Sequence, residues 1–114
     1  MSKHSLGRSA LFSQARAALI RLGADLALAR ARRGMSLRDA ASRLYVSINT
    51  VRNLEAGHPG VGLGILANAL MLYGMLDRLC ELADPAKDRV GFALERRKHQ
   101  SSGPASKSAV TFDV

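Results

Sequence analysis

Residues 36–57 contain the start and stop signals of two short helices that only about three residues separate. Ser36 is a typical N-cap residue, and Asp39 three positions later completes a capping-box pair. Ser47 is a second N-cap, and Gly57 ends the helix that follows it. Helices joined so tightly cross at a steep angle, with a small residue at the crossing and branched apolar residues under the second helix. The residues that meet this requirement are Ala41, Val51 and Leu54.

The composition favours an all-α fold with one core. The chain has 114 residues, of which 47% are hydrophobic, so that one domain has enough apolar side chains to fold. Aromatic residues make up 4% and Trp is absent, whereas strands are rich in aromatic and β-branched residues. We therefore predict an all-α, five-helix bundle of the helix-turn-helix type, with a flexible C-terminal tail.

The spacing of apolar residues predicts three further helices around this pair. One covers residues 10–33 and ends at Gly34, and Gly23 is a point where it could divide into two pieces. Another begins near Leu63 and ends near Gly74, and the fifth covers about residues 75–83. The residues of the fifth helix predicted to be buried are Leu76, Leu79, Cys80 and Leu82.

The two ends of the chain lack such periodicity. We predict only one or two helical turns around Phe92 and Leu94, and disorder from about residue 100, where Ser, Gly and Pro accumulate. Residues 109–114 alternate like a strand without a partner strand in the sequence. The predicted organisation is a flexible arm at 1–9, a helix-turn-helix domain at 10–85 and a C-terminal extension at 86–114.

The chain is strongly basic. Its formal net charge is +8, and the first 58 residues carry ten Lys and Arg against three Asp and Glu. Because this is also the half with the two capped helices, the charge favours a nucleic acid as the partner. The bases do not line one face of a long amphipathic stretch, and the longest apolar run, residues 61–76, is short for a membrane span, so no membrane partner is expected. A single Cys and the lack of a continuous apolar leader indicate a reduced, cytoplasmic setting.

The helix that begins after Ser47 has the side chains for reading bases. Asn can pair with adenine through two hydrogen bonds, Arg with guanine, and Ile or a Thr methyl group can contact thymine. The residues that we judge unnecessary for packing, and predict to read bases, are Ser47, Ile48, Asn49, Thr50, Arg52 and Asn53.

The segment SLRDAASRLYVSINTVRNLEAG, residues 36–57, resembles the Xre/Cro family of helix-turn-helix regulators, which includes the lambdoid phage repressors. The resemblance covers about residues 22–83 and implies a lambda-repressor-like bundle. It also implies an ion pair between Arg30 and Glu55 that holds the fold together. By the same resemblance, Ser47 and Thr50 lie against bases or phosphates. The base readers that it implies are Ile48, Asn49, Arg52 and Asn53.

Two positions depart from the family pattern. Leu37 stands where the family has a phosphate-binding Gln, and Tyr45 stands where the turn has a left-handed Gly. We expect either that packing compensates Tyr45 or that the turn differs. The candidates for phosphate contacts are Ser36, Arg38, Arg43 and His58. For His58, a plain surface-loop role is the favoured alternative.

Segments within residues 59–98 resemble the HipB-type antitoxins, a branch of the same family. This resemblance implies a homodimer that represses its own operon at a palindromic operator and binds a HipA-type kinase toxin. The basic run at residues 96–98 would then contact the toxin or phosphates, or simply be solvated. The alternatives are a free-standing phage- or plasmid-type transcriptional regulator without a toxin, and a protein that coats nucleic acid regardless of sequence.

No pattern in the sequence predicts catalysis, a metal or a cofactor. His4, His58 and His99 are far apart, without Cys or carboxylates at ligand spacing. The glycines at residues 60–64 follow no predicted strand, as a nucleotide-binding loop would require. No nucleophile has a neighbouring base. We therefore expect a binding protein without metal, cofactor or enzymatic activity.

Overall fold

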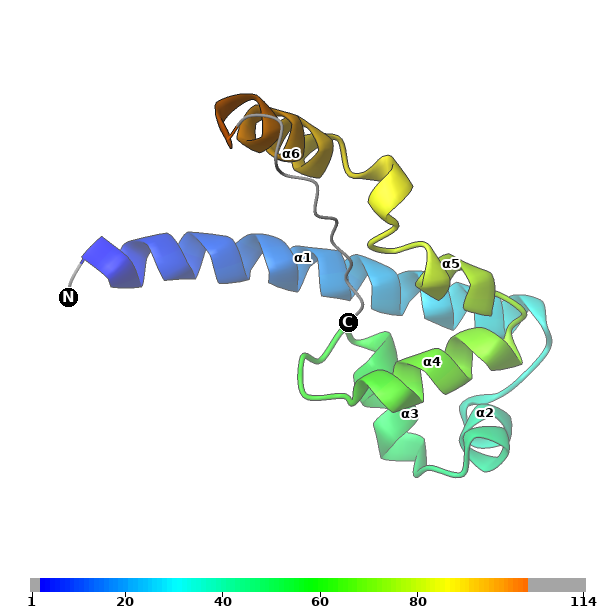
Figure 1. Cartoon of the computed structure of the whole chain (residues 1–114). Coiled ribbons are helices and arrows are strands. Elements are labelled where there is room, and N and C mark those ends of the chain that lie inside the picture. The colour runs from blue at the N-terminus through cyan, green and yellow to red at the C-terminus, as the bar shows by residue number, and fades with distance from the viewer. Residues whose placement is uncertain (1–2, 103–114) are drawn as a thin grey trace. The chain divides into compact units, whose positions relative to one another are not determined.

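Helices dominate the part of the chain that the structure describes. The computed structural model describes residues 3–102, and side-chain environments for residues 12–100. No strand occurs within residues 3–102, which confirms the all-α prediction. The elements in order are α1 (Lys3–Arg32), α2 (Leu37–Leu44), α3 (Ile48–Glu55), α4 (Leu63–Leu72), α5 (Leu76–Cys80), the 3-10 helix η1 (Pro85–Lys87) and α6 (Arg89–Ser102) (Figure 1).

The chain divides into two compact units, Met1–Leu79 and Cys80–Val114. The first unit contains the two capped helices that the sequence predicts, and α2, α3 and α4 gather near the C-terminal half of α1 (Figure 1). α2 contacts both α3 and α4, and α1 contacts α3. This unit therefore holds the candidate site.

α1 is longer than predicted and is continuous. It runs from Lys3 to Arg32, so that helix also covers much of the segment predicted as a flexible arm. Gly23 does not divide it, which corrects our prediction. A Cβ atom at Gly23 would lie 2.5 Å from the carbonyl oxygen of Glu55 and 2.7 Å from the amide nitrogen of Gly57. Gly23 therefore serves the close approach of α1 to the end of α3.

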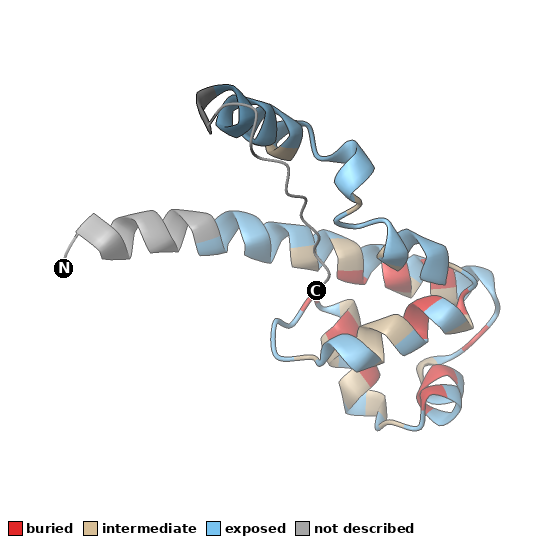
Figure 2. Ribbon diagram, viewed as in Figure 1, coloured by how far each residue is buried: buried red, intermediate tan, exposed pale blue. Residues whose placement is uncertain are grey.

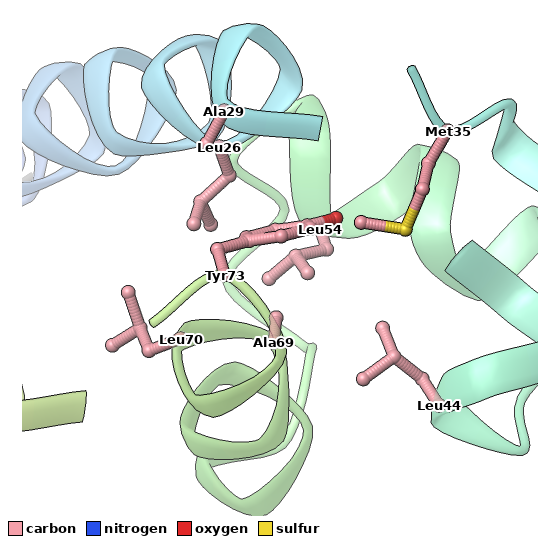
Figure 3. Packing of buried hydrophobic residues seen from close by; sticks show 8 residues of the cluster. All are labelled: Leu26, Ala29, Met35, Leu44, Leu54, Ala69, Leu70 and Tyr73. Carbon is pink, nitrogen blue, oxygen red and sulfur yellow. The ribbon is translucent and has the colours of Figure 1, made fainter. Parts of the chain in front are cut away.

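The main core joins the first four helices. Figure 3 shows Tyr73 lying between Leu26 of α1 and Leu70 of α4, with Met35 and Leu44 beyond the hydroxyl end of its ring. Tyr73 is only 2% exposed, although it is the residue that ends α4. The buried members of this cluster are Leu26, Ala29, Met35, Leu44, Leu54, Ala69, Leu70 and Tyr73. Figure 2 shows the same concentration of buried residues where these helices meet.

A second, smaller cluster lies between α2 and α3. Its buried members are Ala40, Ala41 and Val51, and Leu37 and Ile48 pack against them. The small side chain of Ala41 lets the two helices cross closely, as predicted. The burial of all three packing residues predicted from the sequence, Ala41, Val51 and Leu54, is confirmed.

The turn between α2 and α3 has a left-handed residue. α2 ends in a pair of bonds typical of a Schellman motif, from the amide of Val46 to the oxygen of Ala41 and from the amide of Tyr45 to the oxygen of Ser42. Tyr45 has φ 58° and ψ 42°, and its side chain is 94% exposed. Packing does not compensate this conformation and the turn keeps its left-handed residue, so both predicted alternatives are wrong.

The end of the first unit differs from the prediction. α5 has five residues, which is a little more than one turn, so only Leu79 packs against the main core. Leu76 is 37% exposed, Leu82 is 76% exposed, and Cys80 is exposed. Their predicted burial is wrong, because α5 ends at Cys80 before Leu82, and within α5 it is Leu79 that packs against the core.

The second unit contains η1 and α6. The side chain of Asp88 accepts a hydrogen bond of 2.8 Å from the amide of Gly91, which caps the start of α6. α6 has 14 residues, where the sequence predicted one or two turns, so the described chain has one long α-helix more than the five-helix prediction. Helix continues through residues 100–102, where disorder was predicted, and residues 103–114, with the strand-like residues 109–114, lie outside the described residues. Within the described part, no helix is long and apolar enough to cross a membrane.

Candidate nucleic-acid interface

α3 starts at a side-chain cap. The hydroxyl of Ser47 accepts a hydrogen bond of 3.0 Å from the amide of Thr50, and the two hydroxyl oxygens lie 2.9 Å apart. Both hydroxyls are therefore committed to the start of the helix, where they fix the direction of its first turn. Ser47 is exposed and Thr50 is half-buried.

Polar side chains form a stripe on the outer side of α3. Asn49 and Arg52 are exposed and Asn53 is half-buried, at a spacing that places them on one side of the helix. Val51 and Leu54 are buried on the opposite side. Within the described residues, the side chains of this outer stripe make no hydrogen bond or ion pair with the rest of the chain. Their donors and acceptors are thus available to a ligand.

Ile48 is a packing residue as well as a candidate base reader. Its side chain is half-buried and packs against the cluster of Ala40, Ala41 and Val51. The sequence prediction that it is unnecessary for packing is wrong, because the start of α3 lies over α2. Only the part of Ile48 outside this cluster can contact a base.

α2 carries two exposed basic side chains. Arg38 and Arg43 are both exposed, and neither forms an ion pair within the described part of the chain. Leu37 is half-buried against the α2–α3 cluster, so the position where the resemblance predicted a departure from a phosphate-binding Gln holds a side chain that packs inward.

Ser36 and Asp39 form a reciprocal capping box at the start of α2. The amide of Asp39 donates to the hydroxyl of Ser36 at 3.0 Å, and the amide of Ser36 donates to the carboxylate of Asp39 at 2.9 Å. Hydrogen bonds from the backbone and then the side chain of Ser36 lower the pKa of Asp39. The cap predicted from the sequence is confirmed.

His58 lies in the loop after α3. Its Nδ1 accepts a hydrogen bond of 2.8 Å from the amide of Gly60, so the neutral ring carries its proton on Nε2. The ring is exposed, which leaves the Nε2 proton available to an acceptor such as a phosphate oxygen.

Arg30 and Glu55 tie the end of α3 to α1. Nε of Arg30 donates to Oε2 of Glu55 at 2.7 Å, and Nη2 donates to Oε1 at 2.9 Å. Nη1 donates to the carbonyl oxygen of Met35 at 2.9 Å, so the same guanidinium also holds the loop before α2. The hydrogen bonds to Glu55 raise the pKa of Arg30. The side chains are only 17% and 11% exposed, which makes this a partly buried, two-point ion pair.

Arg33 has a structural role that the sequence analysis missed. It donates to the carbonyl oxygens of Ala29 at 2.9 Å and Tyr73 at 2.8 Å, and its guanidinium carbon lies 5.7 Å from the centre of the Tyr73 ring. In the sequence, the only indication of a role for Arg33 is its position in the last turn of a helix, before Gly34. That position predicts a favourable interaction with the helix dipole. Arg33 is thus occupied within the fold, unlike the arginines of α2 and α3.

Comparison with protein families gives one match that supports this geometry. A family model described as a helix-turn-helix domain matches residues 21–83, more than half of the chain. The comparisons with curated proteins and with solved structures give no significant match. The matched segment contains α2, the turn, α3 and the residues on either side that hold them.

Proposed function

The chain belongs to the helix-turn-helix domain family, and on that premise we propose that it is a sequence-specific transcriptional repressor that inserts α3 into the major groove of DNA. The observation that carries this proposal is the outer stripe of α3, Asn49, Arg52 and Asn53. These side chains have no partner within the described chain and stand on a helix that a cap and an ion pair hold rigidly. Rigid support of this kind is what base readout needs.

The contacts divide into base and phosphate contacts. We assign base contacts to the outer stripe and to the exposed part of Ile48. The start of α3, with Ser47 and Thr50, lies against bases or phosphates. We assign phosphate contacts to Arg38, to the exposed Ser36 cap and to Nε2 of His58. Arg43 lines a groove between α2 and α4, and we give it a different role below.

A dimer follows from this mode of binding. One α3 reads only a few base pairs, whereas two copies would meet half-sites of a palindromic operator about one helical turn (~34 Å) apart. The net charge of +8 supports the phosphate contacts on both half-sites.

The finer proposal is that the repressor is an antitoxin that binds a HipA-type kinase toxin. The resemblance of segments within residues 59–98 to HipB-type antitoxins is its support. The neighbouring reading frame tests it directly, since a kinase-like product that forms a complex with the chain is expected. A neighbour without such a product favours the free-standing regulator.

DNA binding by variants tests the main proposal. A preferred sequence is first selected from a random DNA pool with the full chain, and affinities are then measured by fluorescence anisotropy on this site and on scrambled DNA. Asn49→Ala and Arg52→Ala should each cost about 1–3 kcal/mol on the preferred site and change scrambled-site binding little. The matched controls are Asn68→Ala and Arg32→Ala, exposed residues of α4 and α1 that should leave both affinities unchanged.

Equal losses on the two DNAs would contradict base readout. A wild-type chain that binds all sequences equally, with strong salt dependence, would identify a coating protein instead.

A further inference from the structure

An open groove lies between the end of α2 and α4. Its volume is about 290 Å³, which is enough for one or two side chains of a partner. All its lining belongs to the first unit, and none of it to α3. The lining residues are Arg43, Leu44, Tyr45, Asn68, Met71 and Leu72.

Tyr45 is the most informative of these residues. It is the one non-glycine residue with positive φ in the described chain, so the turn would form with less strain around Gly. Its ring is 94% exposed and its hydroxyl makes no hydrogen bond within the described residues. Neither burial of the ring nor a hydrogen bond of the hydroxyl thus offsets the strained conformation. Tyr is among the residues that most often dominate the binding energy of a protein interface.

The other lining residues define the chemistry of the occupant. Met71 is 59% exposed and, together with Leu44 and Leu72, gives the groove an apolar surface. Arg43 supplies a positive charge that forms no ion pair within the described residues, although it helps to lower the pKa of Asp39 on the same helix. Tyr, Arg and Met are also the side chains enriched at protein interfaces.

We propose that this groove binds a segment of another protein that presents an aliphatic side chain next to an Asp or Glu. The aliphatic side chain fills the apolar groove beside Tyr45, and the carboxylate pairs with Arg43. A DNA backbone would leave the apolar surface of Leu44, Met71 and Leu72 unfilled. A second copy docked groove to groove about a two-fold axis would bring Arg43 toward Arg43 on two chains of net charge +8.

Peptide display with the full chain tests this proposal. Random dodecapeptides on phage are selected against the immobilised protein, and the enriched peptides are synthesised with a fluorophore for anisotropy titration. We expect the enriched sequences to share an aliphatic residue within a few positions of Asp or Glu. Tyr45→Gly and Met71→Gln should each weaken their binding about tenfold or more, as anchor residues do. The matched control is Leu63→Gln, which changes an exposed α4 residue outside this groove and should alter affinity less than about twofold.

Tyr45→Gly keeps the test independent of folding and of DNA binding. Glycine accepts the left-handed conformation, so the melting temperature of this variant should be equal to or above that of the wild type. Its affinity for the preferred DNA site should be unchanged. The proposal is overturned if no peptide is enriched, if the enriched peptides lack the acidic-aliphatic pattern, or if they bind Tyr45→Gly as well as wild type. A loss of DNA affinity in Tyr45→Gly would place this residue on DNA, and a loss of self-association would place it in a dimer interface; either result refutes the proposal.

Discussion

Removal of the Glu55 carboxylate is expected to destabilise the first unit strongly. In Glu55→Ala, the guanidinium of Arg30 loses two hydrogen bonds of 2.7 and 2.9 Å and keeps only the one to Met35. Fully buried pairs cost about 3–5 kcal/mol when one partner is removed, and exposed pairs about 0–1 kcal/mol. Because the two side chains are 17% and 11% exposed, we expect an intermediate loss of about 2–3 kcal/mol.

This loss is large enough to measure by thermal melting. In a domain of 60–100 residues, 1 kcal/mol corresponds to roughly 4–8 °C, so the melting temperature of Glu55→Ala should fall by about 10–20 °C. Circular dichroism at a helical wavelength follows the transition, and urea titration gives the free energy of unfolding. A double-mutant cycle with Arg30→Met should return a coupling energy of about 1.5–3 kcal/mol.

Glu81→Ala is the matched control. It raises the net charge by the same amount, but it breaks an exposed pair with Lys87, whose side chains are 65% and 57% exposed. We expect it to cost less than about 1 kcal/mol. Equal melting temperatures for Glu55→Ala and wild type, or a coupling energy near zero, would refute a stabilising role of the Arg30–Glu55 pair.

Three further substitutions test the packing and the ionisable groups of the first unit. Gly23→Ala should lower the free energy of unfolding by about 1–3 kcal/mol in urea titration, because its Cβ atom would meet backbone atoms at 2.5–2.8 Å. The control Gly64→Ala, whose Cβ atom has nothing within 4 Å, should stabilise by up to about 1 kcal/mol. A Gly23→Ala variant as stable as wild type would contradict the close approach. The lowered pKa of Asp39 means that its carboxylate contributes stability above the ordinary value of 3.8 and loses this contribution as pH falls through the lower folded value. Asp39→Asn should therefore flatten the fall of stability at acid pH. An unchanged fall would count against the capping box. Burial raises the pKa of Tyr73 above 10.0, so its protonated hydroxyl contributes stability below pH 10 and loses this contribution as pH rises through the folded value. Tyr73→Phe should therefore lose less stability than wild type in alkali. An identical loss in the two proteins would argue against the burial of this hydroxyl.

The helices around the turn could be predicted from sequence because their signals are local. An N-cap hydroxyl and the amide that it accepts from are three residues apart, as for Ser36 with Asp39 and Ser47 with Thr50. Such bonds form wherever the rest of the chain lies. The all-α class and the burial of Val51 and Leu54 follow from equally short-range spacing.

The outer stripe of α3 was only partly evident from the sequence. The spacing of Asn49, Arg52 and Asn53 places them on one side of a helix, and this can be read without a structure. The packing of Ile48 against the α2–α3 cluster could not be predicted from the sequence, because it depends on how the two helices cross. The structural role of Arg33 likewise depends on Tyr73, which is 40 residues away.

Sequence information thus sufficed for the all-α class and for the capped α2–α3 pair, both of which rest on contacts within a few residues. The tertiary arrangement was needed to show that Gly23 serves a close approach within one continuous helix, that Cys80 is exposed and that Tyr45 is left-handed without compensation. Each of these depends on which distant segments meet at that position. Burial and backbone strain depend on contacts between distant segments, and the spacing of residues along the chain does not determine those contacts directly.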